Sequence, residues 1–215
     1  GFVATAIMFY YSVVAGWCLY YLSQAIFVPL PETTEQALGI WESFQGSNWP
    51  ILTHATVMLL GGYIVLKGIK SIEKVNMILI PSLLVVLVIS LVKALTIEGS
   101  GAGISYLFTP DWSDLKNPNI WLEALTQNAW DTGAAWGLIL TYAIYMRKQD
   151  NVTVSAFQTG IGNNLVSITS AIIIFSTVFG TLGATMTNAE ILNVMKTSGP
   201  AATGLTFIWM PRLFA

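Results

Sequence analysis

The residue with the clearest capacity for chemistry is Asp131, in the sequence QNAWDTGAAWGL. It lies near the first third of an otherwise apolar stretch, where a carboxylate in a hydrocarbon environment costs at least a few kcal/mol. The residues that follow are small, and glycine weakens a helix by about 1 kcal/mol relative to alanine, so we expect local unwinding here. Acids within a membrane mostly serve ion or substrate paths, and unwound backbone adds polar groups to such a path.

Two pairs of polar residues share a helix face with the spacing i,i+4. Gln127 and Asp131 form the first pair, and Asn163 and Ser167 form the second on the next apolar stretch. If these faces meet, a carboxylate, amide oxygens and a hydroxyl provide the hard oxygen ligands that sodium prefers. The spacing therefore predicts a sodium site that includes Asp131 and Asn163. Simple hydrogen bonding between helices is the alternative for Asn163 and Ser167.

Tyr10 and Tyr11, in the sequence FYYSVVAGWCLYY, form a second candidate group. A phenol inside a helix bundle can donate to the carboxylate of a ligand, although tyrosines in membrane helices are more often packing or interface residues. His54 is alone near the start of an apolar stretch, and we expect an interface residue without a metal-binding role. Cys18 is the single cysteine, which excludes an internal disulfide and indicates packing.

The composition indicates whether the protein folds in water or in a membrane. Hydrophobic residues make up 54% of the 215 residues, charged residues 9%, and the mean hydropathy is +0.67. This is too little polar surface for a soluble globule. The net charge of −2, with scattered basic residues, argues against a nucleic-acid partner. We therefore predict an all-α membrane protein.

Crossing a membrane takes about 20 mostly apolar residues in a helix, because backbone groups in lipid must satisfy their own hydrogen bonds. The fold predicted is a bundle of about five transmembrane helices. They are expected at residues 2–27, 49–66, 75–97, 120–146 and 152–182. We expect the fourth to break near 131–135, residues 98–119 to form a polar connection outside the bilayer, and an outer-loop helix near 188–195.

Basic residues near the ends of these spans predict the orientation. They fall in two short connections, 67–74 and 147–151, which alternation of the spans places on one side. Because basic residues accumulate in cytoplasmic loops, we expect both connections in the cytoplasm and a multi-pass protein of the cell membrane. The chain opens and ends in apolar runs, so we also expect it to be part of a longer protein with helices missing on both sides.

Three segments resemble helices of the neurotransmitter:sodium symporter family, which has the leucine-transporter fold. YYSVVAGW is similar to the third helix, SIEKVNMILIP to the start of the fifth, and NIWLEALTQNAWDTGAAWGLILTYAIYMRK to the sixth. The resemblance implies that residues 1–215 are a partial transport domain, helices three to seven of an inverted-repeat bundle. It also implies sodium-coupled symport of a small solute such as an amino acid, by alternating access and without enzymatic chemistry.

The resemblance also assigns residues to a substrate pocket. Tyr11 matches the tyrosine that binds the substrate carboxylate, and Ile7 matches a side chain that lines the same pocket. Trp130 falls on the aromatic gate over the substrate, Gly133 on the unwound segment, and Trp136 on a further pocket aromatic. Tryptophans stand at 130 and 136 where phenylalanines are common, which leaves the preferred substrate side chain open.

The ion site implied by the resemblance involves the two i,i+4 pairs. Asp131 falls on a sodium-binding threonine and Asn163 on the sodium-binding asparagine. Gln127 and Ser167 fall on positions that surround chloride, or a carboxylate that replaces it. Because Asp131 adds a fixed negative charge in place of a hydroxyl, we expect sodium as the coupling ion and leave the role of chloride open. At Ser71 the family often has glycine, so unwinding on the cytoplasmic side can differ here.

Three further hypotheses remain open from the sequence. Asp131 could carry a proton outward as sodium enters. An intramembrane aspartyl protease would also use a buried aspartate, but it needs two carboxylates that share a site. An ion channel is the third. The expected partners are a small-molecule substrate, the lipid bilayer and the missing helices of the same transporter, and no nucleic acid.

Overall fold

The computed structural model describes residues 2–133, 137–197, 207–208 and 210–213, and all regular structure within them is helical. The fold class is therefore all-α, as predicted. Within these residues, four helices are long and apolar enough to cross a membrane. They are α1 (Phe2–Phe27), α3 (Trp49–Leu66), α4 (Ile69–Thr96) and α8 (Val152–Leu182). α1, α3 and α8 occupy the first, second and fifth spans expected from the sequence.

The third span differs from the expectation at its start. α4 begins at Ile69 and not near residue 75, because Gly68 completes the turn after α3 within one residue. Gly68 has φ of 80°, a left-handed conformation that glycine adopts without the steric penalty of a side chain. Most of the connection expected at residues 67–74 is therefore the first part of α4, so that Lys70 and Lys74 lie on this helix and Lys67 in the turn before it.

The fourth span is two short helices, α6 (Pro118–Thr132) and α7 (Leu138–Ala143). α6 ends at Gly133, with φ of 66°, and α7 starts after Gly137, with φ of 74°. Because both glycines have a left-handed backbone conformation, a continuous right-handed α-helix cannot pass through them. The residues between these two glycines lie outside the described part of the chain.

The connections outside the spans contain helices that the sequence analysis did not predict. α2 (Thr34–Gln45) starts with a capping box, in which Thr33 Oγ1 accepts from the Gln36 amide and Gln36 Oε1 accepts from the Thr33 amide. α5 (Ser100–Phe108) and the 3-10 helix η1 (Trp112–Lys116) lie in the connection 98–119, which was expected to be polar and outside the bilayer.

The last described helices are α9 (Asn188–Thr197), where an outer-loop helix was expected, and α10 (Met210–Leu213). At the start of α9 the Thr187 amide and hydroxyl each donate to Glu190 Oε2 at 2.8 Å. These hydrogen bonds, the one from the backbone first, hold the pKa of Glu190 below its ordinary value.

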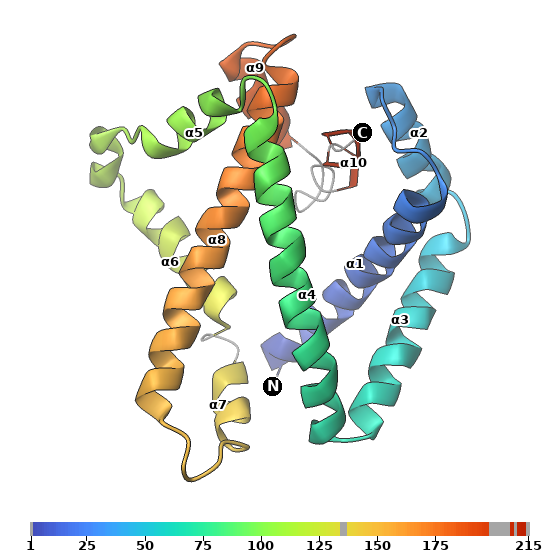
Figure 1. The fold of residues 1–215 in the computed structure, drawn as a ribbon, viewed down its shortest axis with the longest axis vertical. Coiled ribbons are helices and arrows are strands. Elements are labelled where there is room, and N and C mark those ends of the chain that lie inside the picture. Colours follow the sequence, from blue (N-terminus) through green and yellow to red (C-terminus); the bar gives the residue numbers. More distant parts are fainter. Residues whose placement is uncertain (1, 134–136, 198–206, 209, 214–215) are drawn as a thin grey trace.

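The helices pair in two main groups. α1 packs along α3, while α8 packs against α5 and α4 (Figure 1). The turn between α3 and α4 and the connection between α7 and α8 lie at one end of the view, and α2, α5 and α9 lie towards the other. A small buried core at the latter end joins Val178, Phe179 and Leu182 of α8 to Ile191 of α9.

Most apolar side chains of α1, α3 and α4 are exposed in this chain. Examples from α4 are Ile78, Val85 and Ile89, which are 69%, 59% and 63% exposed. Water does not tolerate apolar faces of this extent, so lipid or further protein must cover them. Together with the four long apolar helices, this exposure identifies an integral membrane fold.

We predict that Gly103→Ala destabilises the contact between α5 and α8. A Cβ at position 103 would overlap the Phe175 carbonyl group and lie 2.9 Å from the Ser176 nitrogen. Because overpacking of this kind typically costs about 1–3 kcal/mol, thermal unfolding of the full-length protein in detergent should shift to lower temperature. Gly101→Ala on the same helix meets nothing within 4 Å and is the matched control. Equal midpoints for the two variants would contradict this account of the contact.

Candidate functional site

Asp131 lies in the last turn of α6, and each of its carboxylate oxygens has a hydrogen-bond donor. Gln127 Nε2 donates to Oδ1 at 2.8 Å from one turn earlier on the same helix. Ser167 Oγ of α8 donates to Oδ2 at 3.4 Å, which is at the weak end of hydrogen-bond geometry. The carboxylate therefore joins two helices whose contacting residues are separated by 36 positions in the sequence.

Asn163, the other residue of the predicted sodium pair, lies on α8 one turn before Ser167 and is half-buried. Among the described residues, no hydrogen bond joins Asn163 to Asp131. The carboxylate is held instead by Gln127 and Ser167, the two positions that the family resemblance places around chloride. The joint coordination of sodium by Asp131 and Asn163 stays a prediction.

An open pocket of about 490 Å³ lies beside the carboxylate and is shared by α1, α6, α7 and α8. Its lining residues are Tyr11, Trp130, Asp131, Thr132, Gly133, Ile139, Tyr142 and Thr159. Tyr11 and Trp130 lie across it, with ring centroids 6.1 Å apart and planes inclined by 36°. Among the described lining residues, Asp131 is the one acidic side chain, whereas an aspartyl protease requires two carboxylates that share a site.

The remaining residues predicted for the substrate pocket divide into three cases. Gly133 is buried in the pocket wall, and its amide donates to the Trp130 carbonyl at 3.2 Å, which closes the end of α6. Ile7 is half-buried on α1, one turn before Tyr11, and is not among the described lining residues. Trp136 lies outside the described residues.

Within the described residues there is no group of three or more His, Cys, Asp and Glu side chains that could hold a metal ion. The polar groups gathered at this position are the Asp131 carboxylate, the Gln127 side-chain amide and the Ser167 hydroxyl. This set suits a hard monovalent cation, or a charge-compensating carboxylate beside one, better than a transition metal.

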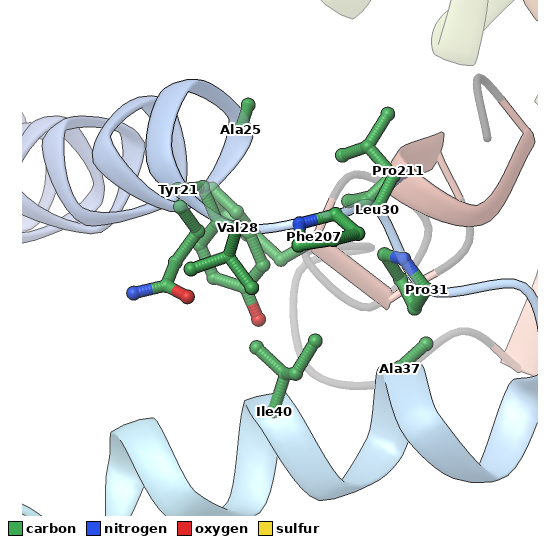
Figure 2. Close-up of a pocket in the computed structure, with 11 residues that line it drawn as sticks. Tyr21, Ala25, Val28, Leu30, Pro31, Ala37, Ile40, Phe207 and Pro211 are labelled. Atoms are coloured by element: carbon green, nitrogen blue, oxygen red, sulfur yellow. The ribbon is translucent and has the colours of Figure 1, made fainter.

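A second cavity, of about 210 Å³, lies between the end of α1, the segment 28–31, α2 and the residues Phe207 and Pro211 (Figure 2). Its walls are almost entirely apolar, and Ala37 and Ile40 of α2 face the proline-rich segment across it. No charged side chain is among its described lining residues, so it is not a candidate for ion binding.

The structure gives His54 a partner that sequence reasoning missed. Its Nε2 lies 2.9 Å from Ser12 Oγ of α1, next to Tyr11 in the sequence. A polar residue within an apolar span needs a hydrogen-bond partner, so the sequence indicated that His54 has one. The partner itself could not be named, because the register between two spans is not visible in a single sequence.

Comparison with known proteins decides the family. The sequence model of the sodium:neurotransmitter symporter family matches residues 34–215. The chain belongs to this family. The predicted resemblance to this family is thereby confirmed, and so is the prediction of a multi-pass α-helical membrane protein.

Several curated proteins of this family are similar to the chain. An uncharacterized sodium-dependent transporter of Methanocaldococcus jannaschii is 32% identical over 99% of the chain and 43% of that protein. The sodium-dependent serotonin transporter of Drosophila melanogaster is 27% identical over 96% of the chain and 38% of that protein. The sodium-dependent neutral amino acid transporter B(0)AT2 of Bos taurus is 28% identical over 82% of the chain and 29% of that protein. The chain thus spans less than half of the length of these relatives.

Gly133→Ala is expected to destabilise this member of the family, because a left-handed residue with a Cβ costs about 1–2 kcal/mol. Gly133→Asn should cost less, since asparagine tolerates this conformation better than most residues. Thermal unfolding of the full-length protein in detergent would measure both effects. If alanine and asparagine at position 133 destabilise equally, the backbone conformation is not the constraint at this site.

Proposed function

We propose that this chain is the central part of a sodium-coupled symporter for a small organic solute, in which Asp131 supplies a fixed negative charge beside the sodium site. The supporting observation is the placement of its carboxylate, with one oxygen on Gln127 and the other on Ser167. These are the positions that the family resemblance assigns to chloride or to its replacement. A carboxylate held there performs the electrostatic role of a bound anion.

The physical need for this charge follows from the low dielectric constant of the membrane interior. Two opposite unit charges about 4 Å apart attract by about 4 kcal/mol at an effective dielectric constant near 20. A sodium ion that loses part of its hydration shell depends on such an attraction to enter the site. With Asp131 in place, sodium binding does not require a chloride ion to enter with it.

The pocket beside Asp131 suits a small zwitterion such as an amino acid. Tyr11 provides a phenol for the substrate carboxylate, and Trp130 provides an aromatic face next to it. Relatives named as a sodium-dependent neutral amino acid transporter and a sodium-dependent serotonin transporter support an amino acid or a related amine as cargo. Ile7 and Trp136 complete the proposed substrate contacts, and Asn163 the proposed sodium ligands.

Alternating access is the proposed mechanism. Left-handed Gly133 and Gly137 mark the end of α6 and the start of α7, and Gly133 lines the pocket, where backbone groups can serve ligands. The other ligands come from the missing helices of the same transporter. Rocking of one helix bundle against the other then opens the site to each side in turn, without a covalent step.

The role of Asp131 is tested by Asp131→Asn in the full-length protein reconstituted in liposomes. A panel of radiolabelled amino acids is assayed with a sodium or a potassium gradient, and with chloride or gluconate outside. Wild type should show saturable, sodium-dependent uptake that does not need chloride. In the absence of chloride, the uptake rate of the variant should be at least tenfold below that of wild type. Chloride should restore part of this uptake, since the anion can replace the missing charge.

Asp114→Asn, in the exposed segment η1, is the matched control and should behave as wild type. Unchanged uptake by Asp131→Asn, with no new response to chloride, would reject the charge-compensation role. Flux through wild type that does not saturate with solute would support an ion channel. Outward proton movement that follows sodium uptake, and disappears in Asp131→Asn, would favour the proton-carrying variant.

The proposed orientation places the connections 67–74 and 147–151 in the cytoplasm. Their location at the same end of the helices supports it (Figure 1). In the full-length protein with Cys18 and any cysteine outside these 215 residues replaced by serine, Lys70→Cys and Lys148→Cys should resist a membrane-impermeant maleimide on intact cells and react after permeabilisation. Asp114→Cys should react with intact cells. The reverse pattern would overturn the orientation.

A further inference from the structure

The hydrogen bond between Ser12 and His54 lies within a close contact of α1 and α3. Gly16, one turn after Ser12 on the same face of α1, is buried against α3. A Cβ at Gly16 would lie 2.7 Å from the His54 nitrogen and 2.8 Å from its Cα. The backbones of the two helices therefore meet at His54, while its side chain reaches Ser12 one turn away.

The direction of the bond follows from the second contact of Ser12. Its hydroxyl donates to the Phe9 carbonyl at 3.1 Å, and a hydroxyl has only one proton. With that proton directed at Phe9, the 2.9 Å contact assigns the tautomer of His54 that carries a proton on Nε2 and donates it to Ser12 Oγ. A chain of two hydrogen bonds thus runs from the imidazole of α3 through Ser12 to the backbone of α1.

These two hydrogen bonds hold the part of α1 that carries Tyr11 in place. The contact at Gly16 sets the separation of the two helices, but a contact between backbones alone permits rotation about the axis of α1. The bond at Ser12 opposes that rotation, because the hydroxyl must remain within reach of the ring. A rotation of about 20° would move an atom at the side-chain surface of a helix, about 6 Å from its axis, by about 2 Å.

We propose that His54 is a positioning residue for the solute pocket: its Nε2 bond to Ser12 sets the rotation of α1 and thereby directs Tyr11 towards Trp130 and Asp131. The effect of His54 on transport rests on the proposed function, whereas its effect on the orientation of Tyr11 does not. Tyr11 already lines the pocket with Trp130, at a ring separation of 6.1 Å. His54 reaches this pocket only through α1.

The geometric content is tested without a substrate. In the full-length protein with Cys18 and any cysteine outside these 215 residues replaced by serine, Tyr11→Cys serves as a reporter, and its alkylation rate by N-ethylmaleimide is measured in membranes. His54→Leu and Ser12→Ala should each change this rate by threefold or more. Their combination should change it no further, because both remove the same bond. His54→Gln retains a donor at a similar distance and should restore the original rate.

Two controls separate positioning from general loss of stability. Thr56→Val on α3 removes a hydroxyl that bonds within its own helix, to the Leu52 carbonyl, and should leave the reporter unchanged. Gly103→Ala destabilises a contact between other helices and should lower the thermal midpoint without changing the alkylation rate. If His54→Leu lowers the midpoint but leaves the rate within the range of these controls, His54 has a packing role only and the proposal is overturned.

Transport provides the second readout once the amino-acid panel has identified a solute, in the protein with native Tyr11. His54→Leu should raise the KM of that solute about three- to tenfold with a smaller effect on kcat, and His54→Gln should keep the KM of wild type. A changed alkylation rate with no solute transported by wild type would reject the proposed function and leave the positioning role standing. An unchanged KM in His54→Leu would overturn the link between His54 and solute binding.

Discussion

The carboxylate of Asp131 imposes the constraint on which the centre of this structure depends. A charged group within an apolar span needs donors for both oxygens, because no bulk water is available in the hydrocarbon layer. Gln127 supplies one donor from the same helix. The other must come from a different helix, so α6 ends close enough to α8 for Ser167 to reach it. The same approach creates the pocket wall in which Trp130 and Gly133 lie.

The sequence predicted the parts of the fold that hydropathy and local chemistry determine. α1, α3 and α8 follow from long apolar runs, and the glycines around residue 133 predicted a weak point in the sixth family helix. It did not predict α2, although Thr33 and Gln36 have the spacing of a capping box, because the segment is short and lacks a long apolar run. α5 was missed because its glycines and serines have low helix propensity. Its contact with α8, which includes the close approach at Gly103, is not visible in the sequence.

The candidate site shows the same division. The spacing i,i+4 placed Gln127 beside Asp131, and this geometry depends on one helix alone. Contacts between helices require their relative rotation and axial register, which one sequence does not contain. The bonds of Asp131 to Ser167 and of His54 to Ser12 are of this second kind. The first was proposed as a meeting of two faces, and the second was not anticipated.

The uneven burial of α8 has a mechanical consequence. Its buried residues all lie between Ile173 and Leu182, where α5 and α9 hold the helix, whereas Phe157, Ile161 and Leu165 of the other half are exposed in this chain. Within the described residues, the burial of α8 is thus concentrated at one end, and that end would be the pivot if the helix tilts. A tilt of about 10° about this pivot would displace the far end, about 30 Å away, by about 5 Å. Ser167 lies much nearer the pivot, so the same tilt would move the bond to Asp131 far less than it moves the far end of α8.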